Sequence, residues 1–353
     1  MTIRVRFAPS PTGSLHLGNA LTAVANRRFA DDRGGVFVLR IDDTDPTRTV
    51  AGGESAIADD LTWLGIAWDE GPIRQSDRAT LHTVAAERAE QEGGARRDTD
   101  GSLRLGEVTL LRADGSATYQ LASVADDLDL GISHVIRGSD HRANEDLQRR
   151  IARAVGGELP EVVHHGLLLG DDGRKLSKRH GHVSIADLRD DGVPAAAVRA
   201  YLEELGLPSH DVRLDRARIG RLAIDAITAM SDEELATAAS APVALARALR
   251  GARSLVEART MARQIESPVA ATVPRAALPT LERFVELRAG AAPTLDEAGA
   301  RSVIRELKAV GGDLKALRLA LTGAERGPEL WTVVAALPAE EALARIERLE
   351  IAD

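Results

Sequence analysis

The chain has 353 residues, of which 44% are hydrophobic and 28% charged, and its formal net charge is −9. This mix is typical of a globular protein with two or three domains, and it excludes intrinsic disorder and fibrous repeats. No apolar run approaches the roughly 20 residues that span a bilayer, and residues 1–6 lack the pattern of a signal peptide, so we expect a cytoplasmic protein without membrane contact.

The N-terminal part predicts the opening of a parallel α/β sheet. Residues 3–8 alternate apolar and basic side chains, as a strand does, and a proline-rich loop over 9–14 follows. A helix is expected over 16–29, then an apolar strand over 36–41 and a second helix over 53–64. This order of strand, loop, helix and strand favours the α/β fold class.

Residues 71–118 interrupt that pattern, and we interpret them as a short insertion. A helix is expected over 79–92. A hairpin is then expected to pair 108–111 with 117–121, because Asp114-Gly115 lies between two apolar runs.

The α/β pattern resumes after the insertion and then gives way to helices. Buried strands are expected at 135–136 and 167–169, with a helix over 144–155 between them. Strand patterns end after Pro208, and residues 215–353 predict an all-α domain whose helices are separated by prolines.

One arginine-rich stretch lies in this helical part. Residues 242–265 hold five arginines against the single acid Glu257, and their apolar residues recur at helical spacing. We therefore expect one amphipathic helix here. An RNA-binding face and an ordinary solvated face are equally compatible with the pattern.

The first candidate site is the loop that leads into the first helix. His16 and Gly18 stand where the helix begins, and unpaired backbone N–H groups make such a helix start favourable for anions. Gly18 would let a base or phosphate approach the backbone, and His16 could donate to a phosphate oxygen. Taken alone, His16 could equally be a capping residue.

The second candidate site is the glycine-bounded loop over 170–181. Only four of the 45 basic residues are lysines, and two of them lie three apart here, at Lys175 and Lys178. Their charge could stabilise a departing pyrophosphate. The loop does not match the Gly-x-x-x-x-Gly-Lys-Ser/Thr phosphate-binding pattern.

Together the two loops resemble the two signature sequences of class I aminoacyl-tRNA synthetases. His16-Leu17-Gly18-Asn19 resembles the first signature, and the stretch Lys-Leu-Ser-Lys-Arg at 175–179 resembles the second. Three further stretches narrow the resemblance to glutamyl-tRNA synthetases. These are residues 6–13, 39–46 and 135–141, and the late sequence 319–323 also matches.

The resemblance implies a Rossmann-type catalytic domain and a set of site residues. His16, Lys175 and Lys178 would be catalytic. The ATP-binding residues would be Pro9, Ser10, Thr12, His16, Gly18, Asn19, Lys175, Leu176, Ser177, Lys178 and Arg179. The glutamate-binding residues would be Arg6, Ser10, Asp42, Tyr119 and Arg137, and no residue would form a metal site.

Within the glutamate pocket, the resemblance implies a role for each group. Arg6 would meet the substrate α-carboxylate, while Ser10 and Asp42 would receive the α-amino group. Arg137 would meet the side-chain carboxylate, with Tyr119 beside it. Glutamyl enzymes often have Glu where this chain has Asp42, but a cation at position 137 favours the acid over the neutral amide.

The resemblance also implies domains, cofactors and partners. The catalytic domain would comprise 1–70 and 119–170, with an acceptor-stem insertion over 71–118. The signature loop and linking helices would follow over 171–214, and an anticodon-binding domain over 215–353. The protein would act as a monomer. It would bind ATP with Mg²⁺, L-glutamate and tRNA(Glu).

Both the insertion and the helical domain are shorter than is usual for the family. The chain contains no cysteine, which excludes disulfides, thiol catalysis and cysteine-ligated zinc, so no zinc is expected.

The sequence leaves two other interpretations open. The chain could place glutamate on a modified tRNA base of the queuosine type, as truncated relatives of this catalytic domain do. It could instead be a non-catalytic paralogue. Residues 215–353 and the full second signature favour the ligase.

Overall fold

The computed structural model describes residues 2–170, 172–174, 176 and 183–352. The chain forms two compact units, and each is described separately. The first comprises Met1–Asp190 and Val198–Arg216, and the second comprises Asp191–Ala197 and Ala217–Asp353.

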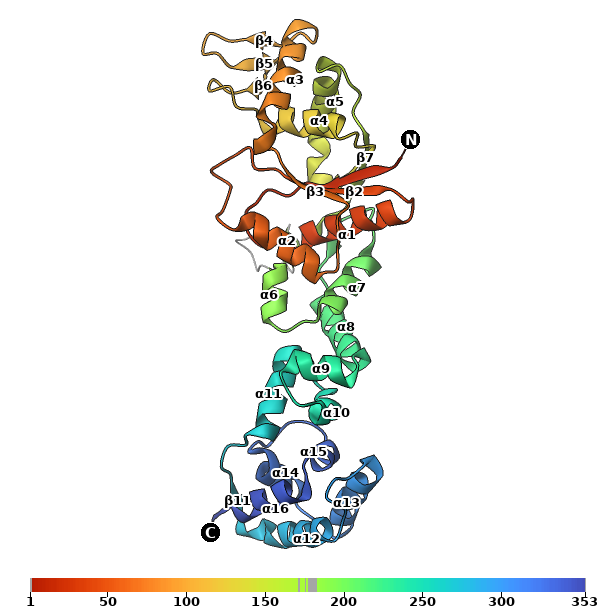
Figure 1. Ribbon diagram of the computed structural model, residues 1–353, viewed down its shortest axis with the longest axis vertical. Coiled ribbons are helices and arrows are strands. Elements are labelled where there is room, and N and C mark those ends of the chain that lie inside the picture. Colours follow the sequence, from red (N-terminus) through yellow and green to blue (C-terminus); the bar gives the residue numbers. More distant parts are fainter. Residues whose placement is uncertain (1, 171, 175, 177–182, 353) are drawn as a thin grey trace. The chain divides into compact units, whose positions relative to one another are not determined.

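A five-stranded parallel sheet organises the first unit (Figure 1). Its strands, in spatial order, are β3 (Glu70–Arg74), β2 (Val36–Ile41), β1 (Arg4–Phe7), β7 (His134–Gly138) and β8 (Glu161–His165). The chain winds outward from β1 to β2 and β3 and, later, from β7 to β8. The order therefore reverses between β1 and β7, and in open α/β sheets ligands bind at the carboxyl ends of strands beside such a reversal.

Helices cover both faces of this sheet. Figure 1 shows α1 (Leu17–Asp31) and α2 (Gly53–Trp63) on one side, and α4 (Tyr119–Asp129) and α5 (Glu145–Ala154) on the other. The strands contribute fully buried side chains to the core, among them Val5, Phe37 and Ile136, and α1 contributes Leu17. The predicted α/β class and the predicted elements over 16–29, 36–41, 53–64 and 144–155 are confirmed to within a few residues.

The region after β3 contains α3 (Ala79–Gln91) and a small antiparallel sheet of β4 (Arg96–Arg97), β5 (Leu103–Leu105) and β6 (Val108–Leu111). The predicted pairing of 108–111 with 117–121 is wrong. Strand β6 pairs with β5, and only a single bridge joins Leu111 to Ala117 before α4 begins at Tyr119. The residues from Leu121 to Asp127 are buried as part of a helix, and this packing overrides the hairpin signal of Asp114-Gly115.

Two strands of the main sheet have no counterpart in the sequence prediction, and one predicted strand lies elsewhere. Strands β3 and β8 sit at the two edges of the sheet and carry polar side chains, which weakens their apolar signal. Conversely, β9 (Leu168–Leu169) pairs with β10 (Val212–Arg213), outside the main sheet. Helices α6 (Ile185–Asp190) and α7 (Ala195–Leu205) lie between β9 and β10 along the chain.

The second unit is helical apart from one short parallel pair, β11 (Thr272–Pro274) with β12 (Glu350–Ala352). Its helices are α8 (Arg216–Ala229), α9 (Asp232–Ala239), α10 (Ala246–Leu249), α11 (Leu255–Glu266), α12 (Leu278–Ala289), α13 (Glu297–Ala309), α14 (Leu314–Thr322), α15 (Leu330–Ala336) and α16 (Ala339–Glu347). They pack around a core that includes Leu249, Phe284, Leu307 and Val333. The predicted all-α character of this part is thus confirmed apart from that pair.

The expected single helix over 242–265 is wrong. The helical conformation is interrupted between α10 and α11. Ser254 caps α11 by accepting a hydrogen bond from the backbone N–H of Glu257. Two of the arginines are also paired within this unit, Arg247 with Glu297 at 3.0 Å and Arg250 with Asp232 at 2.6 Å.

Among the described residues, no helix combines the length and the apolar character that crossing a membrane requires.

Candidate active site

Three buried guanidinium groups lie on one face of the main sheet. Arg6 on β1 pairs in register with Val38, and Arg40 follows two residues later on β2, so both project to the same side. The pairing of Val5 with His134 places Arg137 of β7 on that side too. Arg6 and Arg137 are each 6% exposed, and Arg40 is fully buried.

Two carboxylates hold Arg6 and Arg40 in place. Asp127 of α4 accepts from Arg6 Nε at 3.0 Å and from Arg40 Nη1 at 2.7 Å, both at the same oxygen. Asp42, just after β2, takes a two-point contact from Arg40 Nε at 2.7 Å and Nη2 at 3.2 Å. Burial lowers the pKa of Arg40, but Asp42 and Asp127 outweigh it and raise that pKa, so Arg40 is always charged.

Arg137 differs from the other two because only neutral groups bind it. Its Nη1 donates to the side-chain oxygen of Gln148 at 2.7 Å, and its Nε donates to His164 Nε2 at 3.4 Å. Its Nη2 is buried and has no hydrogen-bond partner among the described residues. Nor does Arg137 form an ion pair with any residue that the structure describes.

The electrostatic surroundings of Arg137 reflect this lack of a counter-charge. Its pKa is lowered, first by burial and then by the positive charge of Arg6, while Tyr119, Asp127 and Glu145 act in the opposite direction. Burial and the charge of Arg137 also lower the pKa of His164, which therefore stays neutral near pH 7 and can accept from Arg137. The site thus holds a buried cation without a counter-charge, and an anionic ligand would stabilise it.

Two other predicted pocket residues, Ser10 and Asp42, follow the carboxyl ends of β1 and β2. The backbone N–H of Asp42 donates to the Pro9 carbonyl at 3.0 Å, and this bond ties the loop after β1 to the residue after β2. Ser10 is the next residue in that loop, and its carbonyl accepts from the Thr12 N–H at 2.8 Å. Tyr119 is the first residue of α4.

The first signature loop leads into α1 as expected. His16 is the N-cap residue of α1, and its side chain makes no capping hydrogen bond. A Cβ built on Gly18 would meet nothing within 4 Å, which leaves open space beside the backbone, and Asn19 is exposed.

Most of the second signature lies outside the described residues, namely Lys175, Ser177, Lys178 and Arg179. Leu176 is described and buried, and its N–H donates to the Leu168 carbonyl at 3.3 Å. Residues 183–185 then run beside the first signature. The N–H of Leu17 donates to the Val183 carbonyl at 3.1 Å, and His16 forms a bridge with Ser184.

Sequence reasoning did not assign Arg40, Asp127, Gln148 or His164 to the site. A signal existed for two of them. Arg40 stands inside the otherwise apolar strand β2, and Asp127 stands inside a buried helix, and ionisable groups at such positions need a partner. Gln148 and His164 carry no comparable signal, because only the folded chain brings them to Arg137.

A third buried carboxylate, Asp126, neighbours Asp127 on α4 and binds the region after β3. It accepts from Arg78 Nε at 2.8 Å, from His82 Nε2 at 2.9 Å and from Gln75 Nε2 at 2.8 Å. Burial tends to raise the pKa of Asp126, but the hydrogen bond with His82 and the charge of Arg40 lower it below its usual value. Two adjacent residues of α4 therefore anchor the pocket and the inserted region.

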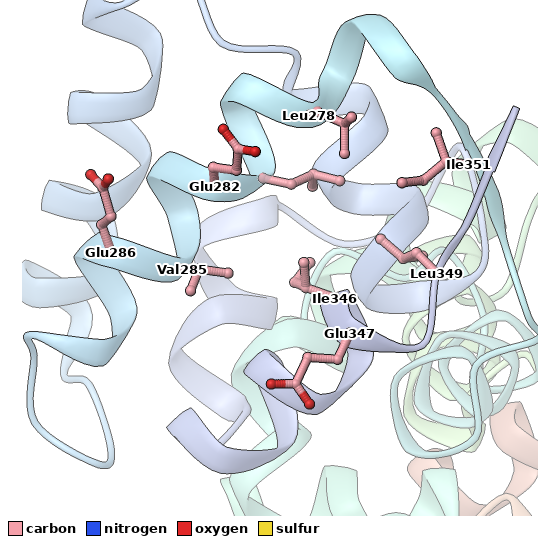
Figure 2. A pocket seen from close by; sticks show the side chains of 9 residues that line it. Leu278, Glu282, Val285, Glu286, Ile346, Glu347, Leu349 and Ile351 are labelled. Carbon is pink, nitrogen blue, oxygen red and sulfur yellow. The ribbon is translucent and has the colours of Figure 1, made fainter. Parts of the chain in front are cut away.

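A separate groove of about 440 Å³ lies in the second unit (Figure 2). It is lined by Leu278, Leu281, Glu282, Val285, Glu286, Ile346, Glu347, Leu349 and Ile351. An apolar floor with carboxylates around it repels phosphates, so we do not place a nucleotide there. Among the described residues, no group of three or more His, Asp or Glu side chains is arranged to hold a metal ion.

Comparison with known proteins gives a consistent result. The family model for class I tRNA synthetases (E and Q), catalytic domain, matches residues 2–105 and 100–233. The chain is 35% identical to glutamate–tRNA ligase 1 of Rubrobacter xylanophilus, over 98% of this chain and 97% of that protein. It is 34% identical to glutamate–tRNA ligase 1 of Acidiphilium cryptum, over 98% and 99%.

The fold also has a solved counterpart. A glutamate–tRNA ligase from Elizabethkingia meningosepticum, crystallised with its amino acid, superposes with a TM-score of 0.79 at 21% identity, over 98% of this chain and 99% of that one. The alignment with the Rubrobacter protein extends over 424 positions, more than the 353 residues of this chain, so that relative carries residues that this chain lacks.

The contacts of Asp126 predict a pH-dependent contribution to stability. Because its folded-state pKa lies below the unfolded value of about 3.9, the stabilisation is complete above about pH 4 and is lost as pH falls through the folded-state pKa. Replacing Asp126 by Asn should lower the free energy of unfolding by about 3 kcal/mol at pH 7, because three donors lose a buried charged acceptor. The difference from wild type should shrink below pH 4.

Denaturant unfolding at several pH values measures this difference. Asp129→Asn is the matched control, since Asp129 pairs with the same Arg78 but is half exposed, and its effect should stay below about 1 kcal/mol. An Asp126→Asn deficit that is equally large at pH 3 and pH 7 would contradict the assignment.

Proposed function

The chain belongs to the class I tRNA synthetases for glutamate and glutamine, and within them to the glutamate–tRNA ligases, and on that premise we propose that it activates L-glutamate with ATP and transfers it to the terminal ribose of tRNA(Glu). The enzyme is thus an aminoacyl-tRNA ligase. Similarity over nearly the full length of the named relatives favours this activity over loading of a tRNA base and over a non-catalytic role.

The observation that carries the choice of glutamate is the environment of Arg137. Its buried Nη2 lacks a partner among the described residues, and its other bonds go to neutral Gln148 and His164. A substrate carboxylate would supply the missing acceptor and the missing charge in a two-point contact. The neutral amide of glutamine would leave the guanidinium uncompensated, which costs several kcal/mol.

The remaining groups of the amino acid fit the surrounding residues. Arg6 is held by Asp127 through Nε, so the outer nitrogens of its fork can face the α-carboxylate. Asp42 is fixed by Arg40, and its oxygens keep lone pairs that can accept from an α-ammonium group beside Ser10. Tyr119 would close the side of the pocket near Arg137.

The activation step needs positioning and charge stabilisation rather than a covalent enzyme intermediate. The glutamate α-carboxylate attacks the α-phosphorus of ATP in line, and pyrophosphate leaves. We assign phosphate contacts to His16 and Lys178, with Lys175 and Arg179 in support, and we assign Pro9, Ser10, Thr12, Gly18, Asn19, Leu176 and Ser177 to the nucleotide. Magnesium would arrive with ATP and be bound mainly by phosphates and water.

The transfer step needs an RNA partner. We propose that 71–118 contacts the acceptor end and that 215–353 contacts the anticodon arm, as the resemblance to the family implies. Arg253, Arg259 and Arg263 remain candidates for phosphate contacts, because among the described residues only Arg247 and Arg250 of this stretch form ion pairs.

The direct test of the function is aminoacylation of total tRNA with radiolabelled L-glutamate and ATP. We expect acid-precipitable label with glutamate and at least about 100-fold less with glutamine. Periodate-oxidised tRNA, whose terminal diol is destroyed, should accept none. Transfer to a modified base is checked separately through the lability of the bond that carries the label, and no label under any condition would show a non-catalytic protein.

Arg137→Ala tests the proposed contact with the side-chain carboxylate. Loss of a buried charged partner should raise the KM for glutamate by about 30-fold or more and change the KM for ATP by less than about threefold. ATP–pyrophosphate exchange, run with and without tRNA, measures both constants. Arg153→Ala, an exposed arginine on α5, is the control. Equal losses for both substrates would mean that Arg137 supports the fold generally.

Lys178→Ala tests the proposed contact with departing pyrophosphate. Loss of that charge should slow ATP–pyrophosphate exchange by about 100-fold or more at saturating substrates. Lys308→Ala removes an exposed lysine from α13 and should leave the rate unchanged. An unaltered rate for Lys178→Ala would refute the assigned role.

A further inference from the structure

A fourth buried carboxylate, Asp60 of α2, lies outside the amino-acid pocket. It is 2% exposed, yet it belongs to a helix whose other buried side chains are apolar. Its Oδ2 accepts from Ser14 Oγ at 2.7 Å and from the Leu15 backbone N–H at 2.8 Å. Its Oδ1 accepts from Arg189 Nη2 at 3.0 Å. One side chain thus binds the residues just before His16 and the helix α6.

The two segments that Asp60 binds are also joined directly to each other. The Ile185 N–H donates to the Leu15 carbonyl at 2.8 Å, and the Leu17 N–H donates to the Val183 carbonyl at 3.1 Å. The Ala186 N–H donates to Ser14 Oγ at 3.1 Å. Ser14 therefore relays between Asp60 and the start of α6, which lies close to α2 in Figure 1.

Helix α2 contacts the first signature loop at a second point. Gly53 lies so close to the loop that a Cβ there would be 2.3 Å from the Pro11 carbonyl oxygen. At the other end of α2, the guanidinium of Arg189 lies 5.1 Å from the ring centre of Trp63. These contacts make α2 a rigid support behind the loop that carries His16.

A buried carboxylate is an expensive way to stabilise a fold, because its desolvation costs several kcal/mol and an apolar residue of similar size is often as stable. It does fix geometry, since both oxygens accept directed hydrogen bonds from defined donors. Here those donors lie on the two segments that flank His16 in space. The contacts suit the exact placement of a loop better than they suit general stability.

We propose that Asp60 is a positioning residue for the activation step. By holding Leu15 and, through Ser14 and Arg189, the segment 183–189, it fixes the backbone from which His16 reaches the ATP phosphates. This inference rests on the proposed function. In the described part of the chain, Asp60 forms no hydrogen bond or ion pair with Arg6, Arg40, Asp42 or Arg137, so its loss should reduce turnover and leave glutamate binding unchanged.

The test compares Asp60→Asn with Asp59→Asn, an exposed neighbour on the same helix. Asn keeps the size of the side chain but has no charge, so it cannot form the ion pair with Arg189. ATP–pyrophosphate exchange, with and without tRNA, should show a kcat at least about tenfold lower for Asp60→Asn, because small misplacements of a catalytic group are costly. The KM for glutamate should stay within about twofold. Asp59→Asn should match wild type in both.

Hydrogen–deuterium exchange supplies a readout that does not need activity. Peptides covering 14–17 and 183–189 should exchange at least about tenfold faster in Asp60→Asn than in Asp59→Asn. If Asp60→Asn does not fold, Arg189→Ala and Ser14→Ala replace it, since Arg189 is 37% exposed and tolerates truncation. Arg189→Lys, which keeps the charge, should recover part of the lost kcat.

The outcomes separate this inference from the proposed function. Wild-type protein without glutamate-dependent exchange would contradict the proposed function, and the deuterium measurement would still decide whether Asp60 holds the two segments. Active wild type with unchanged kcat in Asp60→Asn and Arg189→Ala would overturn the inference alone. A parallel rise in the KM for glutamate and in general unfolding would also overturn it, because that result describes a merely structural residue.

Discussion

The arrangement of the catalytic unit depends on how buried positive charge is neutralised on one face of its sheet. Arg6 and Arg40 share Asp127, and Arg40 also holds Asp42, so these four groups form a continuous chain of ion pairs between β1, β2 and α4. Arg137, on the neighbouring strand β7, is left with neutral partners. The protein therefore compensates two of these three cations internally, and we propose that the third binds a substrate carboxylate.

Buried carboxylates on α4 and α2 also hold other parts of the unit in place. Asp127 serves the pocket, while Asp126 binds Gln75, Arg78 and His82 after β3. Asp60 holds the loop before His16 from the opposite side of the sheet. In each case one buried carboxylate binds donors that lie far from it in sequence, so directed hydrogen bonds fix the positions of those segments.

The sequence predicted those parts of the structure that local patterns control. The apolar strand Val36–Ile41 and the helix Leu17–Asp31 carry clear periodicity, and the signature residues carried the resemblance that pointed to Arg6, His16 and Arg137. The edge strands β3 and β8 were missed because polar side chains obscure their pattern. The partners Asp127, Gln148 and His164 were missed because they meet the pocket through contacts between distant residues, and Tyr119–Asp129 was misjudged where burial of a helical face overrode a turn signal.

We propose that the negative charge of the amino-acid side chain compensates the buried charge of Arg137. Isothermal titration of the wild-type enzyme with L-glutamate and then with L-glutamine, under identical buffer conditions, measures this most directly. We predict that glutamate binds at least about 100-fold more tightly than glutamine, because only a carboxylate compensates the buried guanidinium. Equal affinities for the acid and the amide would contradict it.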